Sequence, residues 1–382
     1  MAKVFYIDPQ SYNNLAVYDH SLLSGVRNCE VTYYHSSLYQ SGQIPGAVHR
    51  SVFVYSSKKG RLGKTLSYFS SIWRIGADVI RERPDVVHIQ WLRFWLFDLL
   101  FACCVRLAGC KLIFTAHNAL PHNPHKGDRL RYRIYYRLAS AIIVHTKVTK
   151  NELCSGFGVD ADKINVIHHG ILDYGTDMSQ VLSRSSEIAS QLDIRKGDLV
   201  FSCLGYQYVY KGIGLVVDVW ERTPKLHDNP RCHLLIVGKN RNVDASLFER
   251  AGKYKNVYLL DEQISDIDFN AYLKLTSVIL LPYISASQSG LLFSAMCSDT
   301  PVMVSNIGGL AEPLSYAGIG WNIGDPTSDN LSDGMLRLLD NPEELARVGS
   351  DSAAFIKVRE IYSWNTISEQ TSQLYIRLSG KN

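Results

Sequence analysis

The feature that most limits how this chain can fold is an alternation of short apolar segments with longer helical ones, and it runs through the sequence twice. In the first half, apolar runs at residues 4–7, 85–90 and 111–115 predict buried strands. Segments between them, such as residues 64–83 and 92–108, are typical of helices. This order predicts an α/β fold with a parallel sheet that is covered by helices on both faces.

The alternation restarts after residues 172–196, a stretch rich in Ser and Asp without a long apolar run. Strands are predicted at residues 199–204, 233–237 and 278–281. Two successive doubly wound units predict a ligand cleft between them, at the carboxyl ends of their strands. The expected domains are an N-terminal Rossmann-like domain at 1–175, a linker at 176–196, a C-terminal Rossmann-like domain at 197–358, and a helix at 359–382 that packs back toward the first domain.

The charge is unevenly spread between the two halves. Formal net charge is only +4, but residues 1–190 hold 22 Lys and Arg against 14 Asp and Glu. A basic first half would suit an anionic surface or acceptor, although solvated charges can also be unequally distributed without a function.

The eight cysteines form no C-x-x-C pair, which favours reduced thiols over a disulfide frame or a zinc site. The first residues, MAKVFYIDPQ, do not resemble a signal peptide, and residues 92–108 are interrupted by Arg93, Asp98 and Arg106. We therefore expect a cytoplasmic protein.

Four places just after predicted strands carry residues suited to chemistry. Lys211, between a strand and a helix, can reach a phosphate, although an exposed lysine at a helix start is the simpler alternative. His117 and Asn118 can bind sugar hydroxyls or stabilise developing charge, or they can simply cap a turn. Gly170, after His169, allows close backbone approach to a ligand or merely ends a strand.

The fourth place is the loop SASQSG at residues 285–290, which sits where a helix begins. Unpaired N–H groups and the positive end of the helix dipole favour an anion such as phosphate there, and a serine-capped turn is the alternative. Glu312 follows a Gly-Gly turn, where it can accept from hydroxyls or cap a helix. His122 and His125 lie in a Pro-rich loop without an acidic ligand, so we expect no metal site.

These pieces, in this order, resemble the retaining GT-B glycosyltransferases of family 4. The resemblance is strongest to a bacterial branch with a QSG loop that builds capsule, exopolysaccharide or lipopolysaccharide. It rests on TAHN at 115–118, IHHG at 167–170, YKG at 210–212, LLIVG at 234–238, LPYISASQSGLLFSAM at 281–296 and TPVMVSNIGGLAE at 300–312.

The resemblance implies a metal-independent and cofactor-free transfer from a UDP- or GDP-linked sugar to a glycan or polyprenyl-linked oligosaccharide, with no nucleic-acid partner. It implies His117 and Lys211 as catalytic residues. The implied donor-binding residues are Gly205, Lys211, Gly238, Gln288, Ser289, Gly290, Leu291 and Glu312. The implied acceptor-binding residues are Asn14, His117, Asn118 and His169.

The sequence departs from the family pattern in three places. Ala286 and Ser294 stand where relatives carry a pair of glutamates, and Tyr206, Gln207 and Tyr208 occupy the stretch of a usual arginine. The segment SYNNLAVYDH replaces an N-terminal Gly-Gly loop. Two alternatives therefore stay open: a non-catalytic subunit that binds nucleotide-sugars or glycans, and a nucleotide-sugar epimerase of similar fold.

Two basic segments suggest peripheral contact with the inner face of the cytoplasmic membrane. They could rest on anionic lipid headgroups, or they could be ordinary solvated faces. The segments contain Lys58, Lys59, Arg61 and Lys64 in the first, and Arg129, Arg131, Arg133 and Arg137 in the second.

Overall fold

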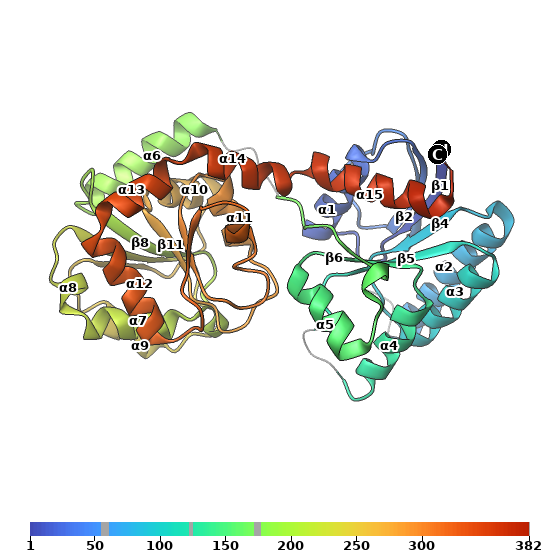
Figure 1. The fold of residues 1–382 in the computed structure, drawn as a ribbon, viewed down its shortest axis with the longest axis horizontal. Helices are drawn as coiled ribbons and strands as arrows, with labels where there is room; N and C mark the ends of the chain where they lie inside the picture. Colours follow the sequence, from blue (N-terminus) through green and yellow to red (C-terminus); the bar gives the residue numbers. More distant parts are fainter. Residues whose placement is uncertain (55–60, 122–124, 172–176, 382) are drawn as a thin grey trace. The chain divides into compact units, whose positions relative to one another are not determined.

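The computed structural model describes residues 1–54, 61–121, 125–171 and 177–381 (Figure 1). The chain forms two compact units, of which the first joins Met1–Gly170 to Ile361–Asn382 and the second is Ile171–Glu360. Each unit contains a parallel sheet with helices packed on it, so the α/β class predicted from the alternation is confirmed. Lys58, Lys59 and His122, which the sequence singled out, lie outside the described residues.

The first unit is built on a seven-stranded sheet of order β3-β2-β1-β4-β5-β6-β7. Val4 of the central strand β1 pairs in parallel with Val31 of β2 on one side and Val86 of β4 on the other. The direction of strand addition reverses between β1 and β4, and in such sheets ligands bind at this switch point. The elements are β1 (Ala2–Ile7), α1 (Asn14–Gly25), β2 (Cys29–Ser36), β3 (Ala47–Phe53), α2 (Arg61–Glu82), β4 (Val86–Ile89), α3 (Trp95–Leu107), β5 (Lys111–Ala116), α4 (Asp128–Leu138), β6 (Ala141–Val144), α5 (Lys147–Phe157), η1 (Ala161–Lys163), β7 (Ile164–Val166) and α15 (Trp364–Ser379).

This sheet is buried on both faces because successive side chains of a strand point in opposite directions. Phe5 and Ile7 of β1 belong to the core that α2, α3, α4 and α5 cover. Val4 and Tyr6 belong to a second core, which α1 and α15 close. The strands therefore read as continuous apolar runs in the sequence.

Helix α15 is the last helix of the chain, yet it packs in the first unit against α1. Ser368 Oγ donates to the Leu22 carbonyl over 2.7 Å, and a Cβ on Gly25 would lie 2.4 Å from Ser368 Oγ. A Cβ on Gly170 would lie 2.3 Å from the ring of Trp364. The close approach that we expected at Gly170 is thus made by the indole of Trp364, which occupies the space we had assigned to a ligand.

The second unit has a six-stranded sheet of order β10-β9-β8-β11-β12-β13, in which the described strand pairs are parallel. Its core includes Phe201, Trp220 and Leu234. The elements are α6 (Met178–Gln191), β8 (Leu199–Leu204), η2 (Val209–Lys211), α7 (Ile213–Arg222), α8 (Pro224–His227), β9 (Cys232–Val237), α9 (Ala245–Ala251), β10 (Val257–Leu260), α10 (Asp266–Leu275), β11 (Val278–Leu281), α11 (Gly290–Cys297), β12 (Val302–Val304), η3 (Pro313–Ser315), β13 (Gly320–Asn322), α12 (Ser328–Asp340), α13 (Pro342–Ser350) and α14 (Ser352–Ile361).

One local prediction was wrong, because most of the expected linker 176–196 is helix α6, which buries Val181 and Ile188 and packs on α10. Helix α5 was missed because its sequence is largely polar, and it begins at a capping interaction of Thr146. Strand β7 ends at Val166, so His168 and His169 follow the strand.

Replacing Gly170 with alanine should destabilise the first unit by about 1–3 kcal/mol, because the added methyl group meets the Trp364 ring. Gly318→Ala is the matched control, since nothing lies within 4 Å of its Cβ position. Urea unfolding of the two variants measures the difference. Equal stability of both variants would show that Trp364 moves aside freely.

Candidate functional site

Lys211 carries an uncompensated charge at the carboxyl end of β8. Its side chain is half-buried at the end of the turn η2, and burial lowers the pKa of its ammonium group to about 8. Its Nζ lies 3.7 Å from the Cβ position of Gly205, and within the described ranges no carboxylate pairs with it. A cation that is partly desolvated and unpaired attracts an anion.

The ends of β8 and β9 are held together closely beside this lysine. Gly238 has a φ of +130°, and a Cβ there would lie 2.3 Å from the Gly205 carbonyl oxygen. The buried Gln207 side chain donates to the carbonyls of Cys203, Gly205 and Val237 at 3.1, 2.7 and 3.2 Å. In the stretch where relatives carry an arginine, Gln207 is thus a structural residue that fixes the loop.

The first turn of α11 offers free hydrogen-bond donors. Ser289 caps the helix, because its Oγ accepts from Leu292 N over 3.4 Å and contacts the Tyr283 hydroxyl at 3.3 Å. Gly290 is exposed, with nothing within 4 Å of its Cβ position. The N–H groups of Gly290 and Leu291 have no partner in the described part of the chain. Such a helix start can bind an anion.

Direct contacts join the Lys211 loop to the loop before α11. Ile284 N donates to the Tyr210 carbonyl over 2.9 Å, and the rings of Tyr210 and Tyr283 meet edge to face with centroids 5.9 Å apart. Gly212 adopts a φ of +76°, and a Cβ there would lie 2.1 Å from the Pro282 carbonyl oxygen. The structure therefore brings Lys211 and the α11 N-terminus together on one edge of the sheet.

The Gly-Gly turn after β12 supports the loop that precedes α11. Gly309 N donates to the Ser287 carbonyl over 2.9 Å, and a Cβ on Gly308 would lie 1.9 Å from the Ala286 carbonyl oxygen. Glu312 is mostly buried, and its Oε1 accepts from the Tyr316 hydroxyl over 3.1 Å.

The two positions where relatives have glutamates add no carboxylate to this loop. Ala286 has no polar side chain, and Ser294 Oγ donates to the Gly290 carbonyl over 3.1 Å. Gln288 is half-buried in the same loop. Among the predicted donor residues, Glu312 is therefore the one that supplies a carboxylate.

In the first unit, polar side chains gather where three neighbouring strands end. Gln90 follows β4, His117 follows β5 and His145 follows β6. His117 Nδ1 lies 3.1 Å from His145 Nε2, and His117 Nε2 lies 3.0 Å from the Gln90 side-chain amide. The Trp91 ring stacks on His117, with centroids 4.2 Å apart and an interplanar angle of 2°.

These histidines are neutral. Burial lowers the pKa of His88 and of His145 to about 3, and it holds the pKa of His117 well below its ordinary value. His145 Nδ1 donates to the Ile167 carbonyl over 2.8 Å, so its Nε2 accepts from His117 Nδ1. A neutral His117 that donates through Nδ1 accepts at Nε2, so the Gln90 amide must turn its NH2 group toward that nitrogen. The contacts to His145 and Gln90 together fix the orientation of the His117 ring.

The network continues into α15 through His88. His88 Nε2 lies 2.7 Å from Thr115 Oγ1, and its Nδ1 lies 2.6 Å from the Tyr375 hydroxyl. The last helix of the chain therefore contributes to the support of the site.

Tyr18 of α1 lies between His169, a further predicted acceptor-binding residue, and the pair His117 and His145. Its ring lies 5.6 Å from His117, 5.9 Å from His145 and 4.9 Å from His169. Asn118 follows His117 in a half-exposed position, and Asn14 is exposed at the first residue of α1.

Sequence reasoning missed Gln90, Trp91, His145 and Tyr18. A usable signal existed for two of them, because Gln90 and His145 directly follow apolar strands. In a parallel sheet, such positions meet at one edge.

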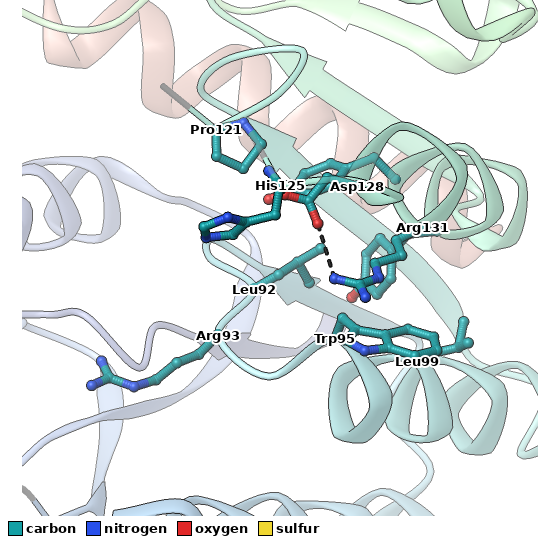
Figure 2. A pocket seen from close by; sticks show the side chains of 10 residues that line it. Leu92, Arg93, Trp95, Leu99, Pro121, His125, Asp128 and Arg131 are labelled. Atoms are coloured by element: carbon teal, nitrogen blue, oxygen red, sulfur yellow. Dashed lines mark hydrogen bonds and ion pairs between the residues drawn. The ribbon is translucent and has the colours of Figure 1, made fainter. Parts of the chain in front are cut away.

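A pocket of about 230 Å³ opens beside α3 and α4 (Figure 2). Asp128 Oδ1 pairs with Arg131 Nη1 at 3.1 Å, and the Arg131 guanidinium lies 5.0 Å from the Trp95 ring centroid. Tyr135 also lines the pocket, and its buried hydroxyl has no partner among the described residues. Charged, aromatic and hydroxyl groups together suit a polar ligand with a flat face.

Two carboxyl groups lie beneath the β1–α1 loop, and the sequence did not indicate them. Asp8 follows β1, and Asp19 accepts from the hydroxyls of Tyr6 and Tyr33 at 2.7 and 2.6 Å. Burial raises the pKa of Asp19 to about 6 and that of Asp8 well above its usual range. Both are fully buried, so they brace the loop from inside. No group of three or more His, Cys, Asp or Glu in the described ranges could hold a metal ion.

Comparisons with known proteins cover both halves of the chain. The profile described as Glycosyltransferase Family 4 matches residues 24–172, and that described as Glycosyl transferases group 1 matches residues 198–341. An uncharacterized glycosyltransferase of Methanocaldococcus jannaschii is 24% identical over 61% of this chain and 59% of its own length. That alignment spans less than two thirds of the archaeal relative.

Two further proteins match over longer stretches. D-inositol 3-phosphate glycosyltransferase of Corynebacterium glutamicum is 23% identical over 76% of this chain and 72% of its own. Among solved structures, Anabaena HepE in complex with UDP superposes with a TM-score of 0.69 at 14% identity, over 98% of this chain and 99% of its own. At 14% identity, the similarity to HepE is a similarity of fold.

Acid should destabilise the first unit through its buried histidines. Their folded pKa lies below the unfolded value, so protons bind preferentially to the unfolded chain as the pH falls below about 6.5. Between pH 7 and pH 5, His145 alone should cost about 2 kcal/mol. Urea unfolding at both pH values should show that His145→Gln reduces this pH-dependent loss by that amount. An unchanged loss would mean that His145 is charged in the folded protein.

Proposed function

Because this chain belongs to family 4 of the GT-B glycosyltransferases, we propose that it transfers a sugar from a nucleoside-diphosphate sugar to a glycan or lipid-linked oligosaccharide. One observation carries the proposal for the donor. An unpaired, half-buried Lys211 lies on a loop that contacts the loop before the open N-terminus of α11. A diphosphate would supply the negative charge that Lys211 lacks as a partner and the acceptor oxygens that the free N–H groups of α11 lack.

The catalytic role of these groups is electrostatic. When the bond between the anomeric carbon and the diphosphate breaks, negative charge develops on the leaving oxygen. Lys211 and the N–H groups of Gly290 and Leu291 stabilise that charge more than they stabilise the neutral bond, which lowers the barrier. Gly205 and Gly238 let the backbone approach the donor closely, while Gln288, Ser289 and Glu312 bind its polar groups.

We propose that transfer retains the anomeric configuration. Retention through a covalent intermediate needs a carboxylate nucleophile. Asp8 and Asp19 are fully buried, and Ala286 and Ser294 are not acids, so these positions offer none. Attack of the acceptor hydroxyl on the same face as the departing diphosphate fits this site better.

The nucleotide of the donor is UDP in our proposal, with GDP as the alternative. HepE, which shares the fold, was solved with UDP. The exposed rings of Tyr206 and Tyr210 flank the Lys211 loop, and aromatic faces of this kind can pack against a nucleobase.

The first unit would bind the acceptor. His117 would lie near the transferred sugar, held by Gln90, His145 and Trp91. Asn14, Asn118 and His169 would add polar contacts. The pocket of Trp95, Arg131 and Tyr135 offers room for a further sugar unit, because the flat Trp95 ring suits such a ligand.

The resemblance to the QSG branch suggests a role in building capsule, exopolysaccharide or lipopolysaccharide, on an acceptor at the inner face of the cytoplasmic membrane. No helix within the described residues is long and apolar enough to span a bilayer. Contact with the membrane would therefore be peripheral in this proposal.

A second candidate is a subunit that binds nucleotide-sugars without turning them over, since Ala286 and Ser294 supply no carboxylate. A screen of UDP- and GDP-sugars, each with and without glycan acceptors, separates the two functions. Release of free nucleotide that depends on acceptor supports transfer. Binding without release for every pair supports the subunit.

Replacing Lys211 with alanine should lower kcat/KM about 100-fold or more, because the removed charge acts on the leaving diphosphate. Lys225→Ala is the matched control, since Lys225 is exposed on α8 and pairs with Asp340. Nucleotide release under limiting donor measures both variants. Wild-type kcat/KM in Lys211→Ala would remove this residue from the mechanism.

Binding of UDP should weaken as the pH rises from 7 to 9. The pKa of Lys211 is about 8, so the cation that attracts the diphosphate is lost across this range. Lys211→Arg should bind with little change over the same range, because arginine stays charged. Calorimetric titrations at several pH values provide the comparison. A parallel decline in both proteins would assign the effect to another group.

A further inference from the structure

Helix α2 carries two apolar stripes, although it has only one sheet to cover. Tyr68, Ile72, Ile75 and Val79 form the buried stripe against the sheet. Leu66, Phe69, Trp73 and Ile80 form a second stripe that faces solvent, and Trp73 is 71% exposed. A surface helix normally shows one apolar face, so the second stripe is in excess of what folding requires.

Helix α3 repeats this arrangement beside it. Phe101, Ala102 and Val105 are buried, while Leu96, Leu100 and Leu107 point outward, and Leu107 is 89% exposed. The two helices pack on each other, and the rings of Phe69 and Phe97 meet with centroids 5.1 Å apart. We call the outward side chains Leu66, Phe69, Trp73, Ile80, Leu96, Leu100 and Leu107 the α2–α3 face.

A shallow apolar cavity of about 220 Å³ lies between the helices within this face. Phe69, Trp73, Phe97, Leu100 and Cys104 are among its lining residues. A continuous exposed apolar surface that spans two helices is unusual for a protein that meets only water, and it marks an interaction site.

The charges around the face are sorted by sign. Of the three acidic residues of the two helices, Asp78 and Glu82 pair with Arg50 and with the exposed Arg81, and Asp98 accepts from Tyr68 over 2.5 Å. Among the basic residues, Lys64 and Arg74 are exposed and have no acidic partner within the described residues.

Arg106 is also exposed at the edge of the face, and its guanidinium donates to Ser140 Oγ over 2.7 Å. The exposed charges of the two helices that lack an acidic partner among the described residues, Lys64, Arg74 and Arg106, are therefore basic. Two copies of the α2–α3 face placed against each other would bring like charges together.

We propose that the α2–α3 face docks on an anionic lipid bilayer, with its apolar side chains in the headgroup region and its basic side chains on lipid phosphates. Tryptophan and leucine favour this depth, and flanking lysine and arginine add attraction to anionic lipids. The inference extends the membrane-bound acceptor of the proposed function by naming the surface that meets the membrane.

The surface shares Lys64 with the first basic segment that the sequence suggested, but it does not include the second segment, on α4. On α4, Arg129 donates to the Gly156 carbonyl over 2.8 Å and lies over the ring of Phe157. Arg131 is paired with Asp128. These two arginines are engaged within the protein, whereas Lys64 and Arg74 are available to lipid.

Co-sedimentation with vesicles tests the proposal without donor or acceptor, so its failure is separate from any failure of the glycosyltransferase assay. The wild-type protein should bind mixed phosphatidylcholine–phosphatidylglycerol vesicles at low salt. The double variant Trp73→Ser with Leu100→Ser should bind roughly tenfold more weakly, because it removes two exposed apolar side chains that would insert into the bilayer. The control Leu182→Ser with Ile356→Ser removes two exposed apolar residues of the second unit and should bind like wild type.

A charge variant keeps the test decisive if the first one folds poorly. Lys64→Glu with Arg74→Glu should lose binding to anionic vesicles and leave the weaker binding to pure phosphatidylcholine unchanged. Wild-type protein that stays in the supernatant, or variants that bind as well as wild type, would overturn the proposal. Light scattering could give one more contrary outcome. The proposal would also be overturned if the wild-type protein were a dimer that does not bind vesicles, and if Trp73→Ser with Leu100→Ser converted that dimer to monomers.

Discussion

The constraint on which this structure depends is the burial of two parallel sheets on both faces. A strand with apolar neighbours above and below accommodates a polar side chain where that side chain is hydrogen-bonded, as His88 of β4 is to Thr115 of β5. Polar groups that can meet a ligand follow the strands instead, and parallel strands place their carboxyl ends along one edge. Gln90, His117 and His145 follow neighbouring strands in the first unit, and Lys211 follows β8 in the second.

Desolvation then decides what each polar group does. His88 and His145 are buried and hydrogen-bonded, so they are neutral and hold their neighbours in place. Asp8 and Asp19 are buried among tyrosines and act as internal braces. Lys211 is only half-buried and has no carboxylate partner in the described part of the chain, so its charge is left uncompensated by the protein. Polar residues at similar positions relative to the strands thus have different roles, and the solvent exposure of each side chain decides which role it has.

The sequence allowed the class of fold to be predicted because strand–helix alternation is a local pattern. The motifs around Lys211 and Ser289 are local too, and the structure brings these two segments together on one edge of the second sheet. The support of His117 could not be predicted. Its partners include Gln90, 27 residues away, while His88 meets Tyr375 across 287 residues. The predicted linker was wrong, because the few apolar residues of α6, such as Val181 and Ile188, are buried by packing on α10, a segment distant in the sequence.

What the sequence by itself determined is the strand–helix alternation of the two units and the Ser–Gly turn at the start of α11, since these follow from side-chain periodicity and from serine and glycine at a helix start. What only the tertiary structure decided is which side chains meet and which stay exposed. Both stripes of α2 are equally apolar in the sequence, and only packing on the sheet buries Ile75 while leaving Trp73 in solvent. Burial depends on contacts between distant segments, which spacing along the chain does not encode.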